Sequence, residues 1–130
     1  MRFEQWKKPR IVEGRLTKWN WMVQHAKKLK IGKMVDIGAF TYINAKYGVT
    51  IEDNVQIGSH CSIYSISTID NKNGPVVLEQ NCKIGTHSVV MPNVKIGRNS
   101  VVGAFSFVVR DIPESVIAFG VPARVVKRIA

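Results

Sequence analysis

Two short segments of the chain place a histidine in the same local setting. Residues 57–60 read Ile-Gly-Ser-His and residues 84–87 read Ile-Gly-Thr-His. A neutral imidazole accepts a proton near neutral pH, so His60 or His87 is a candidate general base for an attacking hydroxyl or amine. The neighbouring glycines leave backbone exposed, and free N–H groups there would stabilise an oxyanion. This chemistry suits acyl transfer if the fold brings the two segments side by side.

An aliphatic residue returns every six positions along much of the chain. The clearest run consists of Ile84, Val90, Ile96, Val102 and Val108. A hexapeptide period is typical of a parallel β-helix, an all-β fold in which three six-residue faces make one 18-residue turn. Anchors 18 residues apart would stack about 4.8 Å from one another. The period therefore predicts that Leu78 lies under Ile96, Ile84 under Val102, and Val90 under Val108.

The six-residue register breaks after Ile63 and returns at Leu78. The intervening segment 65–77 is rich in Asp, Asn, Gly and Pro, which form turns. We expect it to be a loop ejected from one corner of the coil, so that Leu78 continues the face of Ile51. Ile84 would then continue the face of Ile57, and His60 and His87 would stack on the outside of adjacent coils, with the small residues Gly103 and Ala104 one coil further.

The apolar residues of segment 15–30 recur at i, i+3 and i+7, which predicts an amphipathic helix that caps the open end of the coil. A helix on a membrane surface is the alternative reading. The predicted organisation is an N-terminal segment with its capping helix at 1–34, a β-helix at 35–109 with the loop 65–77, and a tail at 110–130.

The formal net charge is +10, and residues 1–33 hold ten Lys and Arg against two acidic residues. Such a charge fits nucleic acid or a polyphosphate ligand. No nucleic-acid-binding motif is present, so we predict no nucleic-acid partner. No apolar run approaches 18 residues, so we predict that the chain has no membrane span and no signal peptide. We therefore expect a cytoplasmic location. Cys61 and Cys82 fall on different edges of the coil and are expected to be reduced core residues.

The hexapeptide anchors and the segment PVVLEQNCKIGTHSVVMPNVKIGRNSVVGAFSFVVRDIPESVIAFGVPARVVKRI resemble the left-handed β-helix acyltransferases, especially the galactoside, maltose and xenobiotic acetyltransferase branch. The resemblance covers residues 35–129. It implies a left-handed coil, a homotrimer with parallel coils, and acetyl-CoA bound between neighbouring subunits. It also implies a sugar or nucleotide-linked amino sugar as acceptor, and no metal.

The resemblance assigns roles to particular residues. Thr86 and Ala104 match positions whose backbone holds the pantetheine arm, with Gly85, His87 and Gly103 beside them. Three cations match basic residues near the CoA phosphates, namely Arg110, Arg124 and Lys127. Asn44 matches an asparagine that lines the acceptor site.

Thr68 stands where these enzymes carry their catalytic histidine, so the general base is not at the expected position. Three explanations remain open: His60 is the base, His87 is the base, or the acceptor is an amine that needs little help. We predict His60, because it lies on the side of Thr86 toward which the CoA thiol points in the family.

Two functions from other classes are compatible with the sequence. A γ-type carbonic anhydrase shares the fold but binds zinc through three histidines, whereas here His25 is predicted on the helix and only His60 and His87 on coils. A non-catalytic scaffold or partner subunit of a larger sugar-modifying enzyme is the second alternative.

Overall fold

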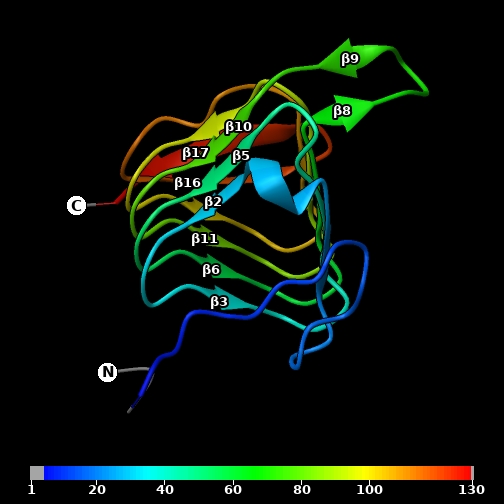
Figure 1. The fold of residues 1–130 in the computed structure, drawn as a ribbon. Coiled ribbons are helices and arrows are strands. Elements are labelled where there is room, and N and C mark those ends of the chain that lie inside the picture. The colour runs from blue at the N-terminus through cyan, green and yellow to red at the C-terminus, as the bar shows by residue number, and fades with distance from the viewer. Residues whose placement is uncertain (1–4, 130) are drawn as a thin grey trace.

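The computed structural model describes residues 5–129. The backbone winds into a left-handed parallel β-helix with three faces, and successive coils add one strand to each face (Figure 1). Face 1 consists of β1 (Met22–Gln24), β4 (Tyr42–Asn44), β7 (Ser62–Tyr64), β12 (Val89–Val90) and β15 (Phe107–Val108). Face 2 consists of β2 (Leu29–Ile31), β5 (Val49–Ile51), β10 (Val76–Leu78) and β13 (Lys95–Ile96). Face 3 consists of β3 (Asp36–Ile37), β6 (Gln56–Ile57), β11 (Lys83–Ile84), β14 (Val101–Val102) and the C-terminal strands β16 (Val116–Gly120) and β17 (Ala123–Arg128).

The strand register confirms the 18-residue prediction. The parallel ladders align Leu78 with Ile96, Ile84 with Val102, and Val90 with Val108.

Inward-pointing side chains form columns of similar residues that run along the coil axis. Ile43, Ile63 and Val90 occupy successive rungs of face 1, and none of them exposes any surface. Each rung buries its aliphatic side chains against the rungs before and after it, so the core is continuous from coil to coil.

The corners of the coil need backbone with positive φ, which asparagine tolerates better than most residues. Asn54, Asn81, Asn93 and Asn99 occupy corners with φ between 61° and 64°. Small polar residues sit just inside the corners and bond to the turning backbone. Ser106 Oγ, for example, donates to the Gly103 carbonyl at 2.7 Å.

Cys61 and Cys82 are buried and unpaired, as predicted. Desolvation raises the pKa of both thiols, to about 12 for Cys82. Neither sulfur is therefore a nucleophile near neutral pH.

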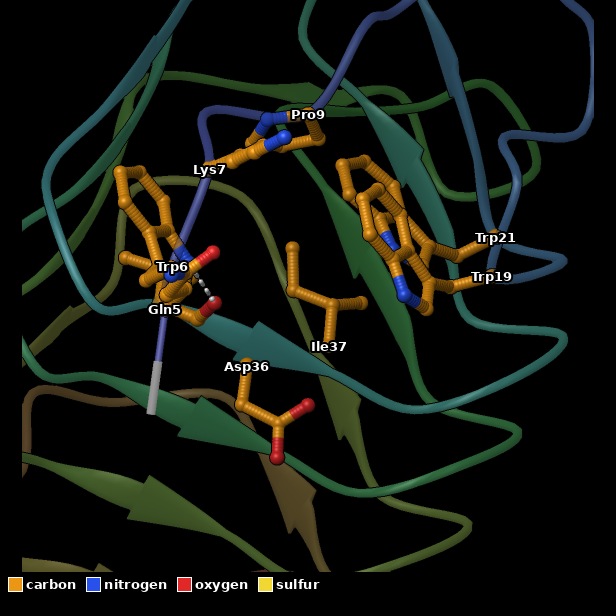
Figure 2. A pocket seen from close by; sticks show the side chains of 9 residues that line it. Gln5, Trp6, Lys7, Pro9, Trp19, Trp21, Asp36 and Ile37 are labelled. Carbon is orange, nitrogen blue, oxygen red and sulfur yellow. Dashed lines mark hydrogen bonds between the residues drawn. The ribbon is translucent and has the colours of Figure 1, made fainter. Parts of the chain in front are cut away.

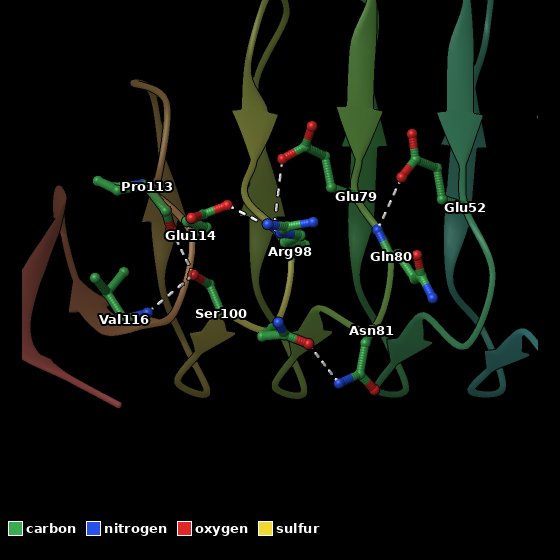
Figure 3. A network of polar contacts seen from close by, with 10 residues as sticks. Glu52, Glu79, Gln80, Asn81, Arg98, Ser100, Pro113, Glu114 and Val116 are labelled. Atoms are coloured by element: carbon green, nitrogen blue, oxygen red, sulfur yellow. Dashed lines mark hydrogen bonds and ion pairs between the residues drawn. The ribbon is translucent and has the colours of Figure 1, made fainter. Parts of the chain in front are cut away.

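Adjacent coils are tied together on the corner between faces 2 and 3 by side-chain oxygens that accept backbone N–H groups (Figure 3). Glu52 Oε1 accepts from the Gln80 N–H at 2.9 Å, and Glu79 Oε1 accepts from the Arg98 N–H at 3.3 Å. Arg98 also forms an exposed ion pair with Glu114 at 3.0 Å. These contacts satisfy donors that the turns leave unpaired.

The capping helix predicted over residues 15–30 is wrong. The segment instead contains β1, the short 3₁₀ helix η1 (Ala26–Lys28) and β2. Val23 pairs with Ile43, and Leu29 pairs with Val49. A helix would bury similar side chains but would leave the edge of the first coil without backbone partners, so strand pairing prevails over a weak helical period.

The open end of the coil is covered by residues 5–9, which run past β3 (Figure 1). Trp6 Nε1 donates to the Val35 carbonyl at 2.9 Å. Trp6, Trp19 and Trp21 then surround a cavity of about 180 Å³ next to Ile37 (Figure 2). Residues 1–4 of the predicted N-terminal segment and residue 130 of the predicted tail lie outside the described residues.

The chain leaves the coil between faces 1 and 2, within the predicted segment 65–77, but the ends of that segment stay in the coil: Ser65 is buried, and Val76 and Val77 belong to β10. The residues between these ends form the hairpin of β8 (Ile66–Ser67) and β9 (Lys72–Asn73), which projects from the body (Figure 1). Leu78 pairs with Ile51, and Ile84 pairs with Ile57, so ejecting the hairpin preserves the phase of the coil.

The C-terminal strands extend face 3. β16 runs parallel to β14, and β17 returns antiparallel to β16. Paired strands thus occur on both sides of the predicted coil range 35–109. Within residues 5–129, no helix is long and apolar enough to cross a bilayer.

Candidate active site

A row of aromatic rings runs along the corner where face 3 passes into face 1. The rings of His60 and His87 stack with centroids 4.7 Å apart and planes 5° from parallel, as the sequence predicts. Phe105 continues the stack beyond His87 at 5.0 Å, and Phe40 lies against His60 at 5.4 Å. The four residues have φ between 56° and 63°, so the backbone holds each ring at the same place on its coil. We call this set the histidine row.

Thr86 Oγ1 lies at the centre of a polar cluster beside His87. It lies 2.8 Å from the Ser59 carbonyl oxygen, 3.1 Å from Ser59 Oγ and 2.8 Å from His87 Nδ1. When the single Thr86 hydroxyl proton is donated to the Ser59 carbonyl, the His87 Nδ1–H is the donor to Thr86 and the His87 Nε2 is the acceptor that a general base or a ligand contact requires.

The small residues predicted to expose backbone beside the row have a packing role as well. A Cβ added to Gly85 would lie 2.5 Å from the Ala104 backbone N, and one added to Gly103 would lie 2.9 Å from Phe119 Cβ. Glycine is therefore required for the coils to approach. Ala104 itself is exposed and Thr86 is half-buried, and their contact with a pantetheine arm stays a prediction.

A hollow of about 590 Å³ lies between the outer surface of face 1 and the hairpin. It reaches across face 1 to Val89 and Phe107, each two residues beyond a member of the histidine row. Its lining is largely apolar, and the polar residues that line it are Tyr42, Asn44, Tyr64, Ser67, Thr68 and Asp70. Asn44 is held in place because its Nδ2 donates to Tyr42 Oη at 3.1 Å and its Oδ1 accepts from the Lys46 N–H at 3.2 Å.

Asp70 and Ser67 are residues of this hollow that were not predicted from the sequence. The Ser67 hydroxyl donates to the Asp70 carboxylate, and this bond is the main reason that the pKa of Asp70 lies below its usual value. Lys72 Nζ lies 3.8 Å from the same carboxylate. Asp70 lies two positions after Thr68, but within a run of turn-forming residues its type indicated only a turn.

Two of the three cations predicted to meet the CoA phosphates line one hollow. Arg110 and Arg124 lie on its walls, between the end of face 1 and the tail. Lys127 pairs with Ile117 further along β17 and is not among the residues that line this hollow.

The three histidines do not converge. His25 lies away from the row, at the start of η1, where its backbone N–H donates to Glu13 at 2.7 Å. Among residues 5–129, no three or more His, Cys, Asp or Glu side chains are placed to hold a metal ion.

Known proteins share this repeat. The model of the bacterial transferase hexapeptide (six repeats) matches residues 75–110, and that of the hexapeptide repeat of succinyl-transferase matches residues 48–69. Galactoside O-acetyltransferase of Escherichia coli (strain K12) is 39% identical over 113 residues, which cover 75% of this chain and 56% of that protein. The chain thus shares the hexapeptide repeat of bacterial transferases and is similar in sequence to hexapeptide-repeat acetyltransferases.

Solved structures of the family have the same fold. The hexapeptide-repeat-containing acetyltransferase VCA0836 from Vibrio cholerae O1 biovar eltor, in complex with acetyl coenzyme A, is 28% identical with a TM-score of 0.79, covering 85% of this chain and 65% of that one. AntD, an N-acyltransferase from Bacillus cereus in complex with dTDP and 3-hydroxybutyryl-CoA, is 25% identical with a TM-score of 0.73, covering 88% and 79%. The chain spans only 56% and 55% of the length of the two galactoside O-acetyltransferases that it matches.

Proposed function

We propose that the protein transfers an acetyl group from acetyl-CoA to an oxygen or nitrogen of a sugar or nucleotide-linked amino sugar. The observation that carries the proposal is the arrangement of face 1, which has the histidine row along one edge and the hollow between its outer surface and the hairpin. In the cyclic homotrimer implied by the family resemblance, the histidine row of one subunit would lie beside the hollow of its neighbour, and both would contribute to one site.

In this site the acyl donor lies along the histidine row, beside Thr86 and Ala104. His60 removes the proton from the attacking hydroxyl or ammonium as its oxygen or nitrogen bonds to the thioester carbonyl. The C–S bond then breaks, and CoA leaves as the thiol after it receives a proton. An imidazole is suited to this step because its ordinary pKa lies near neutral pH.

An amine acceptor is favoured by the Asp70 carboxylate in the hollow. The carboxylate is ionised at neutral pH, and it can pair with a cationic ammonium group as it does with Lys72 in this structure. The similarity to AntD, which is named as an N-acyltransferase, also supports an amine acceptor. In this version of the site, Asp70 and Ser67 orient the amine, and Asn44 contacts the sugar.

Thiol release from acetyl-CoA, measured across a panel of sugars, amino sugars and nucleotide-linked amino sugars, tests the proposal. We expect release with at least one acceptor, with nucleotide-linked amino sugars the fastest class. The absence of release with every acceptor, together with no change in melting temperature on adding CoA, would contradict the proposal and favour a scaffold. A cytoplasmic location belongs to the same proposal, because acetyl-CoA is supplied there.

Replacing Arg124 by Ala is expected to raise the KM for acetyl-CoA by about 10- to 100-fold, because a charge-assisted phosphate contact contributes about 1.5 to 3 kcal/mol. The kcat should change little, since a contact remote from the thioester acts equally in the ground and transition states. Arg128, an exposed arginine on the same strand, provides the matched control. An unchanged KM in the Arg124→Ala variant would remove this residue from the CoA site.

A further inference from the structure

A strongly basic surface lies on the N-terminal segment, outside the site described above. It surrounds a shallow hollow of about 670 Å³. Five exposed cationic side chains line this hollow, and we call the surface the N-terminal patch. These cations are Lys7, Lys8, Arg10, Arg15 and Lys18.

Three large apolar side chains stand exposed among the cations. Val12, Leu16 and Trp19 are 45%, 54% and 46% exposed, and all three line the same hollow. Trp19 also borders the cavity at the end of the coil, so one edge of its ring is anchored in the body of the protein. Apolar side chains in such a setting gain free energy only when a partner or a lipid phase removes them from water.

The backbone under the patch is held by short-range hydrogen bonds. The Arg15 N–H donates to the Val12 carbonyl at 3.0 Å, and the Thr17 N–H donates to the Trp21 carbonyl at 2.7 Å. Thr17 is buried and its hydroxyl also accepts from the Trp21 N–H at 3.4 Å. The patch therefore presents its side chains from two fixed turns, and little conformational entropy is lost when a partner binds.

Glu13 does not neutralise the cations of the patch. Both oxygens of the Glu13 carboxylate accept backbone N–H groups, from His25 and Ala26, each at 2.7 Å. These two bonds lower the pKa of Glu13, so it stays ionised in this structural role. The two ion pairs found among the described residues, Lys72 with Asp70 and Arg98 with Glu114, involve none of the patch cations.

We propose that the N-terminal patch docks the protein onto an anionic membrane surface. Clustered Lys and Arg are drawn to acidic headgroups, while Trp settles at headgroup level and aliphatic side chains enter the boundary of the acyl region. The patch supplies all three kinds of side chain from one surface.

A nucleic-acid partner fits the patch less well. Stacking on a base needs a free aromatic face, and Lys18 Nζ lies over the Trp19 ring at 5.6 Å from its centroid. Val12 and Leu16 would have no complementary group on a phosphodiester backbone. The exposed aliphatic side chains therefore favour lipid over nucleic acid.

Co-sedimentation of the full chain with phosphatidylcholine vesicles, with and without phosphatidylglycerol, tests the proposal. We expect binding only to the anionic vesicles, weakened by salt. Each patch cation should contribute about fivefold to the partition coefficient, so Arg10→Gln with Arg15→Gln should lower it about 25-fold. Lys83→Gln with Lys95→Gln removes the same charge from exposed positions on β11 and β13, outside the patch, and should leave binding near that of the wild type.

The apolar contribution is tested separately. Leu16→Ser should lower the partition coefficient about tenfold. On vesicle binding, the tryptophan emission should shift to the blue, and Trp19→Phe should remove that shift, because Trp21 is only 3% exposed and Trp6 is half-buried.

Equal losses in the patch variant and its charge-matched control would overturn the proposal, since binding would then follow net charge alone. So would full binding by Leu16→Ser. Binding to a single-stranded RNA that Arg10→Gln with Arg15→Gln abolishes and Leu16→Ser leaves intact, without any vesicle binding, would assign the patch to nucleic acid instead.

Discussion

Replacing His60 by Asn or Ala is expected to lower kcat by about 10²- to 10⁴-fold, the range for a positioned acid–base group, with little change in the KM for acetyl-CoA. Asn is the better substitution because His60 has a φ of 56°, a conformation that asparagine adopts at lower cost than alanine. His25 has a φ of 59° and lies away from the histidine row, so His25→Asn is a matched control that should retain full activity.

The pH profile separates His60 from the alternatives. If His60 is the base, the acidic limb of kcat should disappear in His60→Asn. His87→Ala should instead weaken CoA binding and leave a larger residual rate. Near-normal turnover by His60→Asn, with the acidic limb retained, would leave His87 or the amine of the acceptor itself as the source of activation.

Mixing inactive chains tests whether the site is shared between subunits. His60→Asn chains retain the hollow beside the hairpin, and Asn44→Ala chains retain the histidine row. In a cyclic trimer assembled at random from equal amounts of both, about one quarter of the interfaces would combine an intact row with an intact hollow. Activity near a quarter of wild type is therefore expected after mixing and reassembly. A mixture no more active than its components would contradict the shared site, because no intact site forms on mixing when His60 and Asn44 act within the same subunit.

Replacing Ile63 by Ala is expected to lower the free energy of unfolding by about 2 to 5 kcal/mol. Ile63 exposes no surface and lies in one column between Ile43 and Val90, so the lost methyl groups leave a cavity within the stack. Urea denaturation at a fixed protein concentration measures the change, because assembly would couple stability to concentration.

Ile69 provides the control for this substitution. It lies on the same hairpin-bearing stretch of chain but is 99% exposed, so Ile69→Ala should change the free energy of unfolding by less than about 0.5 kcal/mol. A loss of under about 1 kcal/mol for Ile63→Ala would contradict a tightly packed column.

The coil itself was predictable from the sequence. A side chain that points inward at every sixth residue meets its counterpart one turn later. The period of the aliphatic residues therefore predicts both the fold and the register of its strands. The same rule placed His60 against His87, because ejecting a loop at one corner leaves the phase of Ile57 and Ile84 unchanged. The strand register and the stacked histidines recur from coil to coil, so the spacing of residues along the sequence is enough to predict them.

Contacts that do not repeat could not be predicted in this way. The apolar spacing of segment 15–30 fits a helix, and only the open edge of the first coil, with its unpaired backbone groups, selects strands there. Asp70 looked like a turn residue until the hairpin placed its carboxylate with Asn44 in one hollow. The exposure of the apolar side chains of the N-terminal patch could likewise not be predicted from the sequence pattern. The sequence by itself determined the coil and its histidine row, because each rung specifies the next. The tertiary structure decided how the chain covers the end of the coil and which polar groups share a hollow, because those depend on contacts between segments with no common period.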